Sequence, residues 1–146
     1  MAADITGILL VDDESVDLYV MQRSLEKADY RVFPAENAEQ ALAELLAHAS
    51  EIDMLVTDIS LPGKTGLELA RDCLRVRPEL KILFVSGWTG AEFLDYVGIP
   101  RSDVHFLPKP FRSSKLVSRV RQVLTSPERI EWLKEDNKAA SSGSEV

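Results

Sequence analysis

Residues 8–13 read Ile-Leu-Leu-Val-Asp-Asp, an apolar run that ends in two adjacent carboxylates. A short, continuous apolar run bounded by polar residues is typical of a strand buried on both faces. Apolar residues then recur three and four positions apart at Leu18, Met21, Leu25 and Ala28. That spacing places them on one face of an amphipathic helix. The first 28 residues therefore predict a buried strand followed by a helix.

The same alternation of apolar run and helical pattern continues along the chain. Four further strands are predicted, at Arg31–Ala35, Met54–Thr57, Lys81–Val85 and Val104–Leu107. Pro34 has no N–H to donate to a sheet, so the strand that contains it should lie at an edge. Strands that alternate with helices indicate parallel pairing through right-handed crossovers. We expect an α/β protein with a doubly wound, five-stranded parallel sheet and five helices.

Spacings typical of capping boxes mark two of the helix starts, Asn37 with Gln40 and Thr65 with Glu68. The apolar positions expected on the four later helices are Leu42, Leu45, Leu46 and Ala49; Leu67, Ala70 and Leu74; Phe93 and Val97; and Leu116, Val120 and Leu124. We expect one domain over residues 7–125, after an N-terminal extension over 1–6. In the tail, residues 126–146, a short helix over 128–135 and disorder over 139–146 are expected.

Length and composition bound the classes of function. The chain has 146 residues, 45% hydrophobic and 28% charged, with a net charge of −7. One soluble globular domain fits these values, and the acidic balance argues against nucleic-acid binding. Cys73 is the single cysteine, so no internal disulfide forms. Neither a signal peptide nor an apolar run long enough to span a membrane is visible, so we expect a cytoplasmic protein without membrane insertion.

Polar residues follow four of the five predicted strands. Asp12 and Asp13 follow the first, Asp58 the third and Ser86 the fourth, and Lys109 comes shortly after the fifth. The carboxyl ends of parallel strands share one edge of a sheet, where ligands of open α/β folds bind. Each residue alone has an ordinary structural explanation, as a helix cap, a turn residue or a solvated charge. Together they predict one acidic site with a hydroxyl and an ammonium group.

Three neighbouring carboxylates repel one another and favour a hard divalent cation with oxygen ligands. Mg²⁺ suits so few carboxylates better than Ca²⁺, with Mn²⁺ as an alternative, and the spacing does not match an EF-hand loop. A cation, a lysine and a nucleophilic carboxylate are the parts that phosphoryl transfer needs. Since the chain has no glycine-rich nucleotide loop, the phosphoryl group is not expected to arrive as part of a cradled nucleotide.

Four motifs in this order resemble the receiver domain of bacterial response regulators, over about residues 7–125. They are Val11-Asp12-Asp13-Glu14, Asp58-Ile59-Ser60-Leu61-Pro62-Gly63, Val85-Ser86-Gly87 and Leu107-Pro108-Lys109-Pro110-Phe111. The resemblance implies a flavodoxin-like fold with strand order 2-1-3-4-5.

The resemblance also implies a role for each site residue. Asp58 would accept a phosphoryl group. Mg²⁺ would be held by Asp13, Asp58 and the main-chain carbonyl of Ser60, with Asp12 acting largely through a water. Lys109 would pair with Asp58 and then with the phosphoryl oxygens, its aim set by a cis peptide bond before Pro110. Ser86 would move to hydrogen-bond the phosphoryl group, and Phe106 would turn inward into the space that Ser86 leaves.

The resemblance further implies partners instead of an external substrate. The donor would be the phosphohistidine of a histidine kinase or of a histidine phosphotransfer protein. The output would be a protein–protein contact through the surface formed by the helix around Phe93, the strand Val104–Leu107 and the last helix. The chain would thus be a phosphorylation-controlled switch that loses its own phosphoryl group, and not a turnover enzyme.

Two other functions use similar residues but fit this sequence less well. A haloacid-dehalogenase-type phosphatase would need a second aspartate two residues after the nucleophile, where this chain has Ser60. Its nucleophile would also lie on the first strand and not the third. A receiver-like adaptor that never accepts phosphate would be expected to lack some acidic or lysine positions, and none is missing here. The sequence leaves open whether the domain is free-standing or part of a hybrid kinase.

Overall fold

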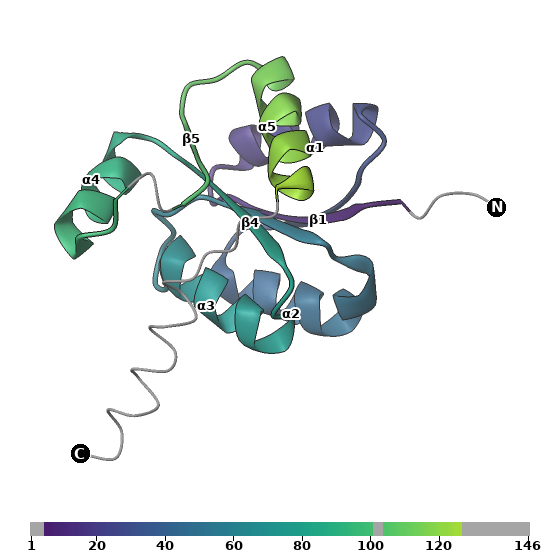
Figure 1. Ribbon diagram of the computed structural model, residues 1–146, viewed down its shortest axis with the longest axis horizontal. Helices are drawn as coiled ribbons and strands as arrows, with labels where there is room; N and C mark the ends of the chain where they lie inside the picture. The colour runs from purple at the N-terminus through teal and green to yellow at the C-terminus, as the bar shows by residue number, and fades with distance from the viewer. Residues whose placement is uncertain (1–4, 101–103, 127–146) are drawn as a thin grey trace, which may run out of the picture.

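Five parallel strands form the central sheet of the computed structural model, which describes residues 5–100 and 104–126 (Figure 1). The strands are β1 (Gly7–Val11), β2 (Arg31–Ala35), β3 (Met54–Thr57), β4 (Lys81–Ser86) and β5 (Phe106–Pro108). Their order is β2-β1-β3-β4-β5, and each neighbouring pair is parallel. The predicted α/β class and strand order are confirmed, and β2 with Pro34 lies at an edge.

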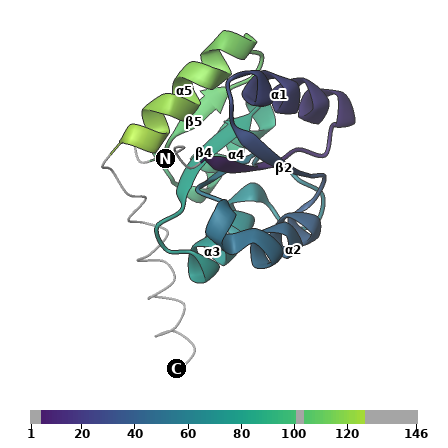
Figure 2. The same cartoon turned by 90° about the vertical axis from the view of Figure 1, so that its right-hand side faces the viewer.

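Helices cover both faces of the sheet. They are α1 (Ser15–Lys27), α2 (Ala38–His48), α3 (Gly66–Val76), α4 (Trp88–Val97) and α5 (Ser113–Thr125), with a short 3₁₀ turn η1 (Ala49–Glu51). α1 and α5 lie side by side on one face, and α2 and α3 lie on the other (Figures 1 and 2). α4 joins the face of α2 and α3, where its Leu94 is fully buried.

Alternation along the strands divides the core into two layers. In β1, Leu9 and Val11 pack with the cluster under α2 and α3, whereas Ile8 and Leu10 pack with the cluster under α1 and α5. Successive side chains of a strand point to opposite faces, so an unbroken apolar run supplies both layers at once. All five positions of β1 are buried. The sequence pattern of residues 8–11 is therefore the pattern of a central strand.

Two of the apolar residues expected on the helices face solvent. Leu46 is 64% exposed and Val97 is 42% exposed, whereas the smaller Ala41 and Gly90 of the same helices are buried. A helix that packs closely on a sheet favours small residues at the contact, which an apolar count overlooks. The fifth strand begins at Phe106 and not at Val104, although Val104 is itself buried.

Capping explains why α2 and α3 begin where they do. Thr65 Oγ1 accepts from the backbone N–H of Glu68, whose side chain accepts from the N–H of Thr65, so this capping box is confirmed. Asn37 Oδ1 accepts from the N–H of Gln40. The Gln40 side chain, however, accepts from the N–H of Glu36 and not from that of Asn37. The second box is therefore only half formed.

The predicted boundaries at the chain ends stay predictions. Residues 1–4 belong to the predicted N-terminal extension, and 127–146 hold the predicted tail helix and disordered end; both lie outside the described residues. Within the described ranges, no helix is long and apolar enough to cross a membrane.

Candidate functional site

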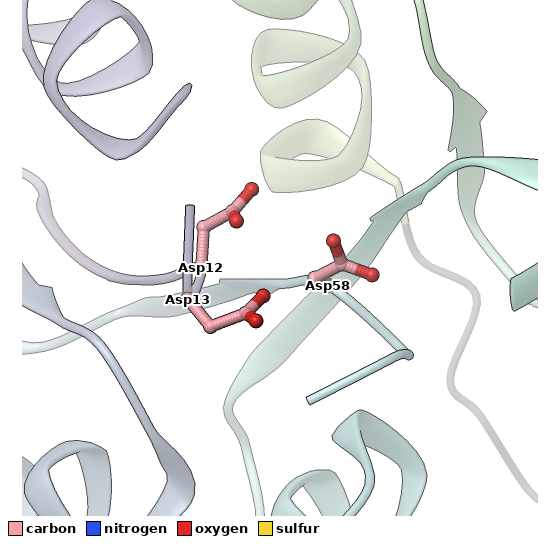
Figure 3. A group of neighbouring side chains, drawn as sticks. All are labelled: Asp12, Asp13 and Asp58. Carbon is pink, nitrogen blue, oxygen red and sulfur yellow. The ribbon is translucent and has the colours of Figure 1, made fainter. Parts of the chain in front are cut away.

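Three carboxylates meet at the carboxyl ends of β1 and β3. Asp12, Asp13 and Asp58 each place one carboxylate oxygen within 4.8 Å of the others (Figure 3). Asp12 is fully buried and Asp58 is 7% exposed, whereas Asp13 is exposed to solvent. The parallel sheet brings them together because β1 and β3 are neighbours in register, with Val11 beside Thr57. Asp13 is thus the member of the cluster that solvent reaches most easily.

Asp12 is held by donors on both oxygens. Its Oδ1 accepts from the backbone N–H of Glu14 at 2.9 Å, just before α1, and its Oδ2 accepts from Lys109 Nζ at 2.7 Å. Burial raises the pKa of Asp12 above its ordinary value, and the hydrogen bonds from Lys109 and Glu14 offset this only in part. The two hydrogen bonds therefore hold the Asp12 carboxylate in place although its burial disfavours the charged form.

Asp58 is equally restrained. Its Oδ1 accepts from Ser86 Oγ at 2.7 Å and from the backbone N–H of Ser60 at 2.9 Å, and its Oδ2 accepts from Lys109 Nζ at 3.0 Å. The donors come from β4, from the loop after β3 and from the segment after β5. Because both oxygens are held, the carboxylate has one orientation before any ligand arrives.

Lys109 is shared among three acidic residues. Besides Asp12 and Asp58, its Nζ lies 3.3 Å from Oδ2 of Asp17 in the first turn of α1. Burial by itself would lower the pKa of Lys109, but the hydrogen bonds to Asp12 and Asp58 outweigh it and raise the pKa. The ammonium group is thus charged at neutral pH. The peptide bond from Lys109 to Pro110 is cis.

The remaining predicted residues lie at the margin of this network. Ser60 places its hydroxyl 3.2 Å from Thr89 Oγ1 of α4. Phe106 is half-buried on β5, where it pairs with Phe84 of β4 and packs against the core under α2 and α3. The structure thus gathers Asp12, Asp13, Asp58, Ser86 and Lys109, while Phe106 stands beside the strand that carries Ser86.

Sequence reasoning missed two residues of the site. Asp17 contacts Lys109 from α1, and its position about one helical turn after the acidic pair was the available signal. Gly66 begins α3 so close to β3 that an added Cβ would lie 2.1 Å from the carbonyl oxygen of Asp58. A glycine at the start of a capped helix signals such close packing. Gly66 therefore lets α3 begin directly against the peptide of Asp58.

The donor set fits a small divalent cation. All three ligand atoms are carboxylate oxygens, the chemistry that Mg²⁺ prefers, and the exposed Asp13 leaves room for waters on the cation. Lys109 adjoins two of the three carboxylates without reaching Asp13 through any described hydrogen bond. One ammonium group thus faces a cluster of three carboxylates, and Asp13 is the one that it does not hydrogen-bond within the described contacts.

The sequence pattern of the response regulator receiver domain family matches residues 8–121. The chain belongs to this family. As a receiver domain, it is a phosphoacceptor switch of two-component signalling.

Named relatives agree with this assignment. The receiver domain is 33% identical to the response regulator receiver protein CpdR of Brucella abortus over 117 residues, which are 80% of this chain and 95% of CpdR. It is 36% identical to the transcriptional regulatory protein AruR of Pseudomonas aeruginosa over 125 residues, 84% of this chain and 50% of AruR. It is 31% identical to the sensor kinase CckA of Brucella abortus, spanning 84% of this chain and 13% of CckA. The chain thus spans half or less of two of these relatives.

Solved structures show the same fold. The response regulator receiver protein from Sinorhizobium medicae superposes with a TM-score of 0.73 at 31% identity, covering 87% of this chain and all of that one. The receiver domain of the hybrid histidine kinase CckA superposes with a TM-score of 0.67 at 30% identity, covering 82% of this chain and 99% of that one.

Proposed function

We propose that Asp58 accepts a phosphoryl group from a phosphohistidine of a histidine kinase or histidine phosphotransfer protein. The observation that carries this is the restraint of both Asp58 oxygens by Lys109 and Ser86 beside two further carboxylates. A nucleophile held in one orientation next to fixed positive charge is what phosphoryl transfer requires.

The proposed transfer is a nucleophilic displacement at phosphorus. A carboxylate oxygen of Asp58 forms a bond to phosphorus while the bond from phosphorus to the donor imidazole nitrogen breaks, and the imidazole keeps the electron pair and later takes a proton. The product is an acyl phosphate on Asp58. Lys109 offsets the added negative charge, and Ser86 offers its hydroxyl proton to a phosphoryl oxygen. Water then hydrolyses the acyl phosphate and resets the switch.

Mg²⁺ would be held by Asp13, Asp58 and the main-chain carbonyl of Ser60, with Asp12 acting through a water and Mn²⁺ as an alternative ion. The bound cation would offset the negative charge of the carboxylates and of the phosphoryl oxygens. The exposure of Asp13 and its place outside the hydrogen bonds of Lys109 support this assignment.

An apolar patch on α1 supports docking of the phosphohistidine partner. Val16, Tyr19 and Val20 are 71%, 62% and 50% exposed on the helix that follows the acidic pair. Beside Val20, a hollow of about 210 Å³ is lined by Asp17, Val20, Met21, Lys109, Pro110 and Phe111. Exposed apolar groups that lie together are typical of protein interaction sites, and this patch adjoins Lys109.

We place the output contact on the surface of α4, β5 and α5, with Ser86 and Phe106 as the switch. Trp88 and Tyr96 of α4 are 79% and 87% exposed, which supports a protein contact there. Phe106 borders the same surface and would turn inward when Ser86 moves toward the phosphoryl group. A cytoplasmic location fits this function and stays a prediction.

Transfer of label from radioactive acetyl phosphate tests the proposal. We expect Mg²⁺-dependent, acid-labile label on the wild type and none on Asp58→Asn, which keeps the shape of the side chain. Asp53→Asn is the matched control, since Asp53 lies at the opposite end of β3. Equal labelling of Asp58→Asn and wild type would refute the assignment. A wild type without label would favour the non-phosphorylated adaptor.

A further inference from the structure

Gly90 in the first turn of α4 lies directly against Ser86. A Cβ added at Gly90 would lie 1.9 Å from Ser86 Oγ and 2.5 Å from Ser86 Cβ, with Ile59 Cβ at 3.3 Å. The first two distances are far shorter than carbon atoms tolerate, so neither atom could keep its place. No other residue type at this position leaves the Ser86 side chain where it is.

Backbone conformation does not explain this glycine. Among the described glycines, those with positive φ are Gly63 and Gly98, and Gly90 lies within a regular helix. Glycine is among the least favourable residues inside a helix, so its presence calls for a reason in packing. Gly87, at the N-cap of the same helix, shows the contrast, because a Cβ there would meet no atom within 4 Å.

The close approach determines where the Ser86 hydroxyl points. Ser86 is fully buried, and its Oγ donates to Asp58 Oδ1 at 2.7 Å. Rotation of Ser86 about χ1 would move Oγ away from a new methyl group, but Cβ cannot rotate away. The first turn of α4 would then have to shift, although Thr89 ties it to Ser60 across 3.2 Å.

We propose that Gly90 is a positioning residue for phosphoryl transfer, because its missing side chain makes the space in which Ser86 reaches Asp58. This inference rests on the proposed function. Gly90 has no side chain to offer to the phosphoryl group and acts through Ser86. Gly90→Ala should therefore impair the same step as loss of the Ser86 hydroxyl.

Labelling rates with acetyl phosphate and Mg²⁺ test this. We expect Gly90→Ala to slow labelling about tenfold, as much as Ser86→Ala does. The double variant Ser86→Ala with Gly90→Ala should be no more than about twofold slower than either, because Ser86→Ala removes the same hydroxyl that Gly90→Ala displaces. Gly87→Ala is the matched control and should label within about twofold of wild type.

A second readout is independent of labelling. Gly90→Ala should lower the midpoint of urea unfolding in the wild type, and should leave it unchanged or raise it in Ser86→Gly, where the clashing atoms are gone. If Gly90→Ala alone does not fold, Ser86→Gly with Gly90→Ala should fold.

Several results would overturn the inference. One is a Gly90→Ala variant that is labelled at the wild-type rate. Another is a double variant slowed by the product of the two single effects. A third is a Gly90→Ala change that lowers the unfolding midpoint equally with and without the Ser86 side chain. Failure of the Ser86→Gly double variant to fold would do the same. Absence of label on the wild type would instead overturn the proposed function, and this inference with it.

Discussion

Lys109 Nζ lies 2.7 Å from Asp12 Oδ2, nearer than the 3.0 Å that separates it from Asp58 Oδ2. The lysine thus makes its shorter hydrogen bond to the carboxylate that is fully buried, and not to the one proposed to be phosphorylated. A buried carboxylate has little water to replace a lost donor, which makes this bond important for folding. Added negative charge on Asp58 would draw the same ammonium group toward the phosphoryl oxygens. Lys109 would therefore serve stability in one state and, in the proposed phosphorylated state, charge neutralisation.

Removal of the ammonium group should destabilise the fold. Lys109→Met leaves Asp12 and Asp58 each without one donor, so we expect a loss of about 2–3 kcal/mol in unfolding free energy measured by urea with chelator present. Lys64→Met is the matched control, because Lys64 is 46% exposed in its ion pair with Asp72 and should cost less than about 1 kcal/mol. Equal losses in the two variants would show that Lys109 is only a surface charge.

Asp13→Asn should raise the melting temperature when chelator is present. The substitution removes one of three clustered carboxylates, the one that Lys109 does not neutralise through a described hydrogen bond. For the wild type, Mg²⁺ at about ten times its dissociation constant should add about 1.4 kcal/mol, or about 3–6 °C. The variant should lose most of that response.

Glu14→Gln controls for the loss of one negative charge, since Glu14 adjoins Asp13 but lies outside the carboxylate cluster. Glu14→Gln should keep the Mg²⁺ response. If Asp13→Asn melts below wild type in chelator and still responds fully to Mg²⁺, Asp13 supports the fold instead of binding the cation.

Stability should depend on the protonation of Asp12. Burial raises the pKa of Asp12 above 3.8, so above that pH the folded protein retains a proton that the unfolded chain has released. The folded state then binds more protons, and the Asp12 contribution to stability falls as pH rises through this window. In chelator, the stability of wild type relative to Asp12→Asn should therefore decline as the pH rises above 3.8. Thermal melts across that range measure it, and a rising difference would mean that the hydrogen bonds outweigh burial.

Trp88 should report occupation of the site by its fluorescence. It is the first residue of α4, next to Thr89, whose hydroxyl lies 3.2 Å from that of Ser60. Beryllofluoride with Mg²⁺ mimics the phosphoryl group, and movement of Ser86 or of this turn should alter the surroundings of the indole. Trp132→Phe removes the other tryptophan and serves as the background for the titration. An unchanged spectrum at saturation would show that the first turn of α4 does not respond to the site.

Much of this protein follows from the order of its residues. The apolar runs of β1 and β3 alternate between two core layers, so each strand was visible as a continuous run, and Pro34 marked the edge. Strand ends of a parallel sheet share one edge, which is why Asp12, Asp58 and Ser86 were predicted to meet. These features depend on the spacing of apolar residues along each strand or helix and on the direction in which each strand runs. Both can be read from the sequence.

Tertiary structure alone decided which atoms meet across elements. The sequence contains no sign that Lys109 lies nearer to Asp12 than to Asp58. The position of Gly90 against Ser86 depends on how closely the first turn of α4 approaches β4. The exposure of Leu46 depends likewise on which face of α2 meets the sheet. Periodicity describes a side chain relative to its own backbone, whereas these contacts arise from the placement of one backbone against another.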